Sequence, residues 1–220
     1  MKGLLIKDFK LMKNQRQFFT TIVLLTIAFM SVYKNLNFVI SYMTILFGMF
    51  AVSSISYDRY DNGESYLFTL PISKRTYVIE KYVFGLLLSV SALSVVSIFT
   101  WIAAIVRHMD YPLEEFISIA ISSLLIIVFM HAYMVPINLK FTADKNRIVL
   151  SISVGIVLLV VFLFLTLVSH LGIGGEIEAW FTNLINHKAG MLIGTIILIA
   201  AVLLVISYNI SVRIMERKEF

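Results

Sequence analysis

Six long apolar runs, separated by short polar segments, dominate the chain. They cover residues 18–33, 38–57, 82–106, 116–138, 148–170 and 190–210. A membrane-crossing helix needs about 20 predominantly apolar residues, and only the first run is shorter than that. Irregular backbone is too costly in lipid, and no run alternates with a period of two as a barrel strand would. The pattern predicts an all-α, polytopic membrane protein with six transmembrane helices in one domain, 1–220.

The positive charges divide unevenly between the two ends of these predicted spans. Fifteen of the eighteen Lys and Arg residues lie in the N-terminal segment, loops 58–81 and 139–147, and the C-terminal tail, while the other three loops carry one each. Cytoplasmic loops are enriched in Lys and Arg. The bias predicts that both termini are cytoplasmic, in a bacterial plasma membrane. It also explains the net charge of +5 without nucleic acid.

The predicted spans contain no Asp, Glu, Lys or Arg. Transporters driven by ion gradients depend on such residues within the membrane. His131 is the one ionisable side chain well inside a span, and a hydrogen bond to a neighbouring helix explains it more simply than a proton relay. Pro136, in the same span, is expected to kink or end the helix.

Motifs for catalysis and nucleotide binding are missing from the sequence. It has no HExxH, no GxSxG, no Walker A motif and no cysteine. We therefore predict that the chain is not an enzyme and holds no metal or cofactor of its own. An intramembrane hydrolase built on His131 with Glu114 and Glu115 is a weaker alternative, since the topology places these carboxylates outside and His131 towards the inner leaflet.

One polar stretch, YDRYDNGESYLFTLPISKRTYVIEKY at 57–82, holds a short apolar patch inside a loop that the topology makes water-facing. Asp61 or Asn62 can cap a helix, and Glu64 suits its first turn. Pro71 disfavours helix at the preceding residue. The result is a short helix across the cytoplasmic end of the bundle.

This short helix can expose different apolar side chains, depending on its rotation. Tyr66, Leu67 and Phe68 are the candidates. An amphipathic helix with two or three such anchors can fit the groove of a partner protein. An ordinary interfacial helix, with Tyr and Phe at the headgroup level, is the alternative.

Residues 62–87, NGESYLFTLPISKRTYVIEKYVFGLL, resemble the ABC-2 type permeases, which are membrane subunits of one class of ATP-driven exporter. The family often shows an acidic residue and glycine, a Leu-x-x-Leu-Pro-[Val/Ile]-Ser-[Arg/Lys] core, and Val/Ile-x-x-Lys-[Tyr/Phe]. The matching residues here are Gly63, Glu64, Leu67, Leu70, Pro71, Ile72, Ser73, Lys74, Val78, Lys81 and Tyr82. The basic opening segment and the six-span layout extend the resemblance over the whole chain in outline.

The resemblance implies that residues 61–71 form a coupling helix, which seats in a cleft of a separate cytosolic ABC ATPase that binds ATP and Mg. The residues assigned to this contact are Asp61, Gly63, Glu64, Tyr66, Leu67, Phe68, Leu70 and Pro71.

The resemblance also implies a second permease copy, in a homodimer or a heterodimer. Small six-span members export, or confer immunity to, amphipathic peptides such as bacteriocins and phenol-soluble modulins. The expected function is therefore export of an amphipathic or hydrophobic substrate, with a peptide as the expected class. A membrane scaffold or sensor subunit is the alternative.

The segment 1–17 is expected to form a basic interfacial helix. Lys7, Lys10, Lys13 and Arg16 recur every three residues. Such a helix lies on the inner membrane surface and is attracted to anionic lipid. In the family it also touches the ATPase, and a simple topology anchor is equally compatible with the pattern.

Overall fold

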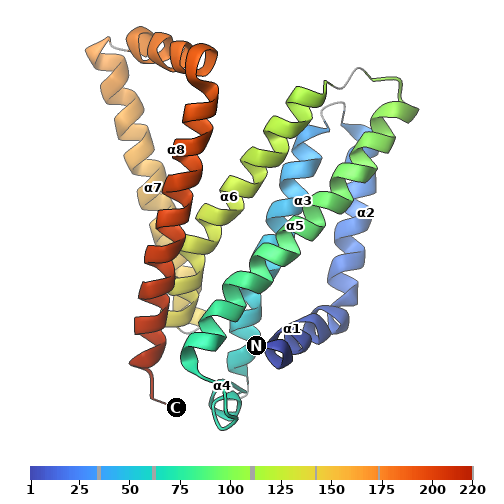
Figure 1. The fold of residues 1–220 in the computed structure, drawn as a ribbon, viewed down its shortest axis with the longest axis vertical. Helices are drawn as coiled ribbons and strands as arrows, with labels where there is room; N and C mark the ends of the chain where they lie inside the picture. Colours follow the sequence, from blue (N-terminus) through green and yellow to red (C-terminus); the bar gives the residue numbers. More distant parts are fainter. Residues whose placement is uncertain (34–35, 61–62, 110–111, 142, 173, 220) are drawn as a thin grey trace.

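The computed structural model describes the chain except residues 34–35, 61–62, 110–111, 142, 173 and 220, and also except the side chains of 143–144, 146–147 and 176–192. The described residues form helices and connecting turns, without a strand, so the all-α prediction is confirmed. The helices are α1 (Lys2–Asn14), α2 (Arg16–Val32), α3 (Asn37–Arg59), α4 (Gly63–Leu67), α5 (Lys74–Val106), α6 (Leu113–Lys140), α7 (Ala143–Leu171) and α8 (Gly174–Glu216) (Figure 1).

A helix covers each of the six apolar runs. Within the described residues, five helices are long and apolar enough to cross a membrane: α3, α5, α6, and the parts Ile148–Leu171 of α7 and Ile193–Glu216 of α8. A sixth is reached if α1 and α2, which meet at a bend of 66°, count as one broken span. The chain is a multi-pass membrane protein, and both termini lie at the same end as α4 (Figure 1).

The polar loop predicted at 58–81 is shorter in the structure. α3 continues to Arg59 and α5 already begins at Lys74. The hydroxyl of Ser73 caps α5 by accepting from the backbone N–H of Thr76 at 3.1 Å. Asp58 and Lys81, expected to face water, are instead helical and buried. The hydropathy boundary differs from the helix boundary because these charges pair with each other.

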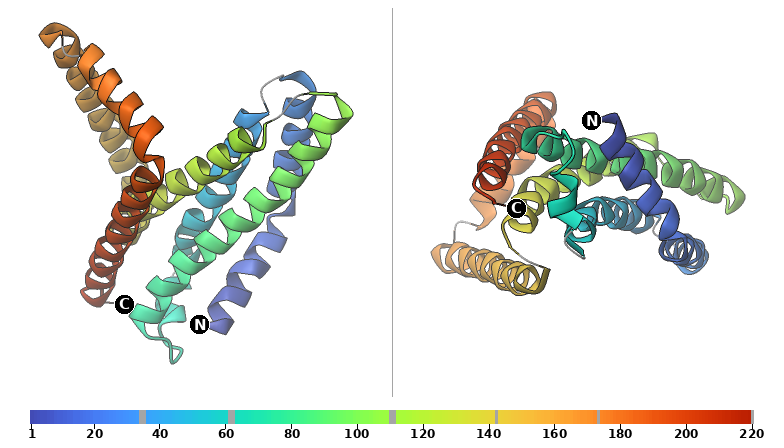
Figure 2. Two further views of the ribbon diagram at one scale, coloured as in Figure 1. Left: turned by 45° about the horizontal axis from the view of Figure 1, so that its top comes forward. Right: turned by 90° about the horizontal axis from the view of Figure 1, so that it is seen from below.

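α7 and the far part of α8 lean away from the other helices (Figure 2). None of the apolar window of α7 is buried within the chain, although it is the most hydrophobic of the candidate spans. Residues 193–199 of α8 are exposed as well. A single copy therefore leaves these surfaces to lipid or to a second subunit.

Pro136, expected to kink or end its helix, lies inside α6, which continues to Lys140. Proline lacks an N–H, which leaves the carbonyl four residues earlier without its helical donor. That carbonyl belongs to Ala132, and it accepts a hydrogen bond from the hydroxyl of Ser207 on α8. The hydroxyl of Tyr82 on α5 lies 2.6 Å from the Ser207 oxygen. The missing helical bond is thus replaced by a polar contact that joins three helices.

His131 is fully buried in the middle of α6. Its Nδ1 donates to the carbonyl of Ile127 in its own helix at 2.9 Å, so the predicted bond to a neighbouring helix is wrong. Nε2 has no hydrogen-bond partner among the described residues and packs against Gly85 of α5. Glu115 lies sixteen positions away, or about 24 Å along the helix, which removes the geometry needed for a hydrolase.

Candidate coupling site

α4 lies across the end of the bundle that carries both termini (Figure 1). It begins at Gly63, directly after residues 61–62, so the predicted role of Asp61 lies outside the described residues. A side chain on Gly63 would put a Cβ atom 2.9 Å from the backbone oxygen of Asp58, so the chain needs glycine to turn this closely. Backbone bonds extend the turn to Leu70, whose N–H donates to Leu67 at 3.3 Å.

The rotation of α4 separates neighbouring apolar side chains into two sets. Tyr66 is 73% exposed and Leu70 is 44% exposed. Leu67 and Phe68 instead pack against a buried cluster formed by α1, α3, α5, α6 and α8. The Phe68 ring meets the Tyr77 ring of α5 edge to face, at a centroid distance of 5.5 Å. The outward anchors are therefore Tyr66 and Leu70, which the sequence alone left open.

A buried carboxylate clamps α4 to the bundle. Glu64 is 8% exposed, and its oxygens accept from Arg59 Nε at 3.1 Å and from Lys218 Nζ at 3.2 Å. Arg59 also donates to the backbone carbonyls of Leu139, at 2.6 Å, and Phe141 at the end of α6. The clamp ties α4 to α3, to α6 and to the tail after α8.

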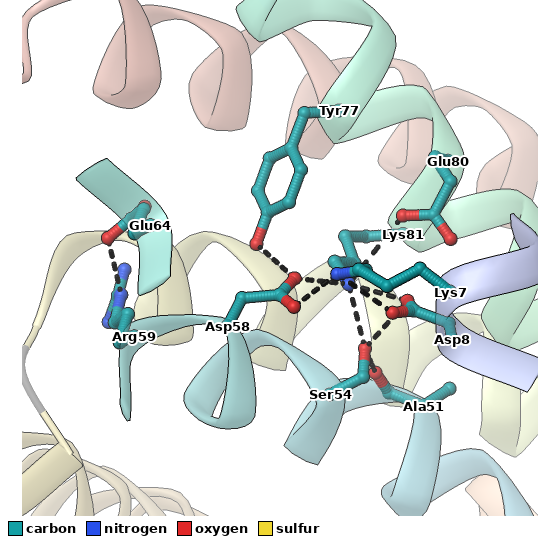
Figure 3. Close-up of polar contacts among 10 residues, drawn as sticks. All are labelled: Lys7, Asp8, Ala51, Ser54, Asp58, Arg59, Glu64, Tyr77, Glu80 and Lys81. Atoms are coloured by element: carbon teal, nitrogen blue, oxygen red, sulfur yellow. Dashed lines mark hydrogen bonds and ion pairs between the residues drawn. The ribbon is translucent and has the colours of Figure 1, made fainter. Parts of the chain in front are cut away.

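A second, larger ion cluster lies next to this clamp (Figure 3). Its centre is Lys81 of α5, whose Nζ lies 2.6 Å from Asp8 of α1 and 2.7 Å from Asp58 of α3. Nζ also donates to the hydroxyl of Ser54 at 3.0 Å. Since Lys81 and Asp8 are at most 1% exposed, this is a buried charge network, in which removing the partner of a paired charge is costly.

Three further side chains complete the cluster. Lys7 pairs with Asp8, at 2.9 Å, and with Asp58. The hydroxyl of Tyr77 donates to Asp58 at 3.0 Å. Glu80 is also fully buried, but its carboxylate is 3.6 Å from Lys81 and has no hydrogen-bond partner among the described side chains and backbone groups. The cluster fixes α1 to α3 and α5.

This network was not foreseen from the sequence. The spacing of basic residues predicts that Lys7 faces lipid, but Lys7 is half-buried and pairs with carboxylates. Lys10, Lys13 and Arg16 are exposed, so these three residues remain on the predicted basic face. The available signal was Asp8, which is the only acidic residue before Asp58.

The multi-pass helical fold agrees with what comparison with known proteins finds. A family model described as "ABC-2 family transporter protein" matches residues 3–216. The chain belongs to the ABC-2 transporter family. The suspected resemblance is therefore confirmed over nearly the whole chain. No curated protein and no solved structure gives a significant match.

An ABC-2 permease is a transport subunit, and membership implies association with an ABC ATPase. In this permease the outward anchors of α4 and the buried clamp beneath them occupy one end of the bundle. The predicted residues Gly63, Glu64, Leu67 and Phe68 lie on the inner side of this segment, and Tyr66, Leu70 and Pro71 are exposed on it.

Proposed function

We propose that this ABC-2 permease is the membrane subunit of an ATP-driven exporter in a bacterial plasma membrane. It forms the translocation path for an amphipathic or hydrophobic peptide, and residues 61–71 couple it to a cytosolic ATPase. The observation that carries the coupling role is the split between the exposed Tyr66 and Leu70 and the inward Leu67 and Phe68. The outer pair can enter a partner's cleft while the inner pair transmits force.

The contacts of α4 support a mechanical role. Phe68 touches Tyr77 at the start of α5, and Glu64 is held by Arg59 at the end of α3. Arg59 in turn holds the end of α6. A push on Tyr66 would therefore reach three helices together. An ordinary interfacial helix lying on lipid requires no such clamp.

A groove of about 540 Å³ lies beside the outward anchors, between α4 and the beginning of α1. It is bordered by Tyr66 and Leu70 on one side and by Leu4 and Lys7 on the other. An ATPase surface that receives α4 would also meet α1 here. This supports the contact between the basic helix and the ATPase over a simple topology anchor.

The proposed second permease copy would cover α7 and the far part of α8. Their apolar surfaces are unburied in one chain, and a Cβ atom at Gly194 would meet open space. Gly190 falls among the residues whose surroundings the structure does not describe. The peptide class of the substrate rests on the family resemblance and on spans that carry scattered Ser and Thr among apolar residues.

The coupling role is tested by Tyr66→Asp combined with Leu70→Asp, with Tyr66→Phe combined with Leu70→Met as the matched control. The tagged permease is purified in mild detergent from its native host, and co-purifying chains are identified by mass spectrometry. We expect the wild type and the control to retain an ATP-binding subunit, and the Asp variant to lose it at an unchanged melting temperature.

Two outcomes would count against the proposal. If the Asp variant keeps its ATPase, the coupling surface lies elsewhere. If the wild type comes down without an ATPase even after crosslinking, the scaffold or sensor function is favoured.

A further inference from the structure

A pocket of about 690 Å³ opens between α6 and α8 at the end of the bundle that carries the C-terminus. One wall is apolar, with Pro136 and Ile137 of α6 facing Ile210 and Ile214 of α8. Around this wall stand four basic residues: Lys140, Arg213, Arg217 and Lys218. The pocket therefore combines an apolar wall with a positively charged rim.

Few of the described carboxylates offset the positive charge of this rim. Arg213 and Arg217 are exposed and form no ion pair within the described part of the chain. They are four residues apart on α8, so their side chains lie on the same face. Lys140 lies over the ring of Phe141, 5.4 Å from its centre, and pairs with none of the carboxylates whose side chains the structure describes. Glu216, in the same turn, is paired with Arg75.

Among the side chains that the structure describes, Lys218 is the rim residue with a carboxylate partner. It donates to Glu64, which it shares with Arg59. Burial, together with the positive charge of Arg59, lowers the pKa of Lys218 below its usual value. Lys218 therefore already serves a carboxylate within the chain. A further anion in the pocket would be attracted by the other three cations, Lys140, Arg213 and Arg217.

The depth of the four basic residues relative to the membrane indicates which kind of anion they bind. Lys140 ends α6, and Arg213 lies in the last turn of α8, at the ends of two candidate spans. Their charges are therefore expected at the level of the lipid headgroups, while Ile210 lies one turn deeper. A basic pocket between transmembrane helices at this level suits the headgroup of an anionic phospholipid.

We propose that this pocket binds one anionic phospholipid of the adjacent leaflet, with its phosphate among Lys140, Arg213 and Arg217 and an acyl chain against Ile137 and Ile210. The positive rim favours an anionic headgroup. The apolar wall favours a lipid with an acyl chain over free phosphate. The proposal is independent of the coupling role of α4.

The test is lipid binding to the purified full-length permease in a neutral detergent, followed by native mass spectrometry during titration with phosphatidylglycerol. Phosphatidylcholine and glycerol phosphate are titrated in parallel. We expect one tightly bound phosphatidylglycerol, with much weaker binding of the other two. Arg213→Gln combined with Arg217→Gln should weaken phosphatidylglycerol binding roughly 30-fold, because each basic residue near the surface contributes about a factor of 5.

Two further variants separate the site from general electrostatic attraction. Lys145→Gln removes a positive charge from an exposed position of α7, outside the pocket, and should leave binding within 3-fold of wild type. Ile210→Trp keeps every charge but fills the apolar wall, and should weaken binding about 10-fold. The melting temperature without added lipid shows that each variant is folded.

Three results would overturn the proposal. Weakening by Lys145→Gln as large as that caused by the Arg213 and Arg217 changes would show that the attraction is not confined to the pocket. Glycerol phosphate binding as tightly as phosphatidylglycerol, with no effect of Ile210→Trp, would show a simple anion site. Loss of the co-purifying ATPase on changing Arg213 and Arg217, with lipid binding intact, would assign the rim to the ATPase.

Discussion

The ammonium nitrogen of Lys81 lies 2.6 Å from a carboxylate oxygen of Asp8, seventy-three residues earlier in the chain. Both side chains are buried at the end of the helix bundle. A buried charge costs several kcal/mol unless it is paired and hydrogen-bonded, and Asp58 and Ser54 complete the pairing of Lys81. The ion pairs therefore hold α1 to the bundle at one defined position. Apolar contacts alone would not define that position.

Replacing Lys81 by Met should destabilise the permease strongly. The change leaves the buried carboxylates of Asp8 and Asp58 with Lys7 as their remaining cation. Removing one partner of a buried pair costs roughly 3–5 kcal/mol. A large fall in the melting temperature of the detergent-purified protein is the expected result. A melting temperature equal to wild type would mean that the charges are solvated rather than buried.

Glu80→Gln, in the same cluster, is expected not to destabilise the permease. Lys7 and Lys81 already balance Asp8 and Asp58, and the Glu80 carboxylate has no hydrogen-bond partner among the described residues. Glutamine keeps the volume and removes an unbalanced buried charge. The melting temperature should equal or exceed that of the wild type. Destabilisation as large as that of Lys81→Met would contradict the assigned pairing.

The sequence was sufficient to locate the helices but not the ion cluster. An apolar run marks the part of a helix that can lie in lipid, and a helix covers each of the six runs. The sequence predicts a water-facing loop for Asp58 and Lys81, because charge at the edge of an apolar run usually marks the end of the helix. Their partner Asp8 lies on a different helix, and a single sequence carries no information about such distant pairs.

The exposed face of α4 also depended on contacts that the sequence does not reveal. Periodicity over a helix of five residues is too short to define an inner side. The rotation is set by Glu64, which is held by Arg59, and by Phe68, which packs on Tyr77. Leu67 and Phe68, proposed as anchors together with Tyr66, are thereby turned inward, and Leu70 takes their place outside.

The contact between Gly85 of α5 and His131 of α6 predicts that the stability effect of a change at one residue depends on the other residue. A Cβ atom at position 85 would lie 2.0 Å from Nε2 of His131. Gly85→Ala should therefore cost roughly 1–3 kcal/mol through overpacking. In a His131→Ala background the same change should cost little, since the ring is gone. Equal effects in both backgrounds, measured by thermal unfolding, would refute the contact.

Ser207→Ala should destabilise the permease through the carbonyl of Ala132. This carbonyl has no helical donor because of Pro136, and it accepts from Ser207. A buried acceptor that loses its partner costs about 1–3 kcal/mol. Pro136→Ala restores an N–H, so Ser207→Ala should have a smaller effect in that background. Melting temperatures of the two single variants and the double variant measure this difference.

Arg59→Lys should loosen α4 without removing a charge. The guanidinium donates at once to Glu64 and to two carbonyls of α6, and an ammonium group cannot match that forked geometry. We expect amide exchange of residues 63–70 to accelerate about 10-fold, which corresponds to about 1.4 kcal/mol. Arg75→Lys is the control, because the Arg75 pair with Glu216 is exposed and contributes little.

The orientation of the bundle can be measured directly, since the chain contains no cysteine. Ser65 on α4 and Glu114 in the first turn of α6 are both exposed, and the bias of Lys and Arg predicts Ser65 inside and Glu114 outside. In intact cells a membrane-impermeant maleimide should label Glu114→Cys, and Ser65→Cys only after permeabilisation. The reverse labelling would place α4 outside, where no cytosolic ATPase could reach Tyr66, and would end the coupling proposal.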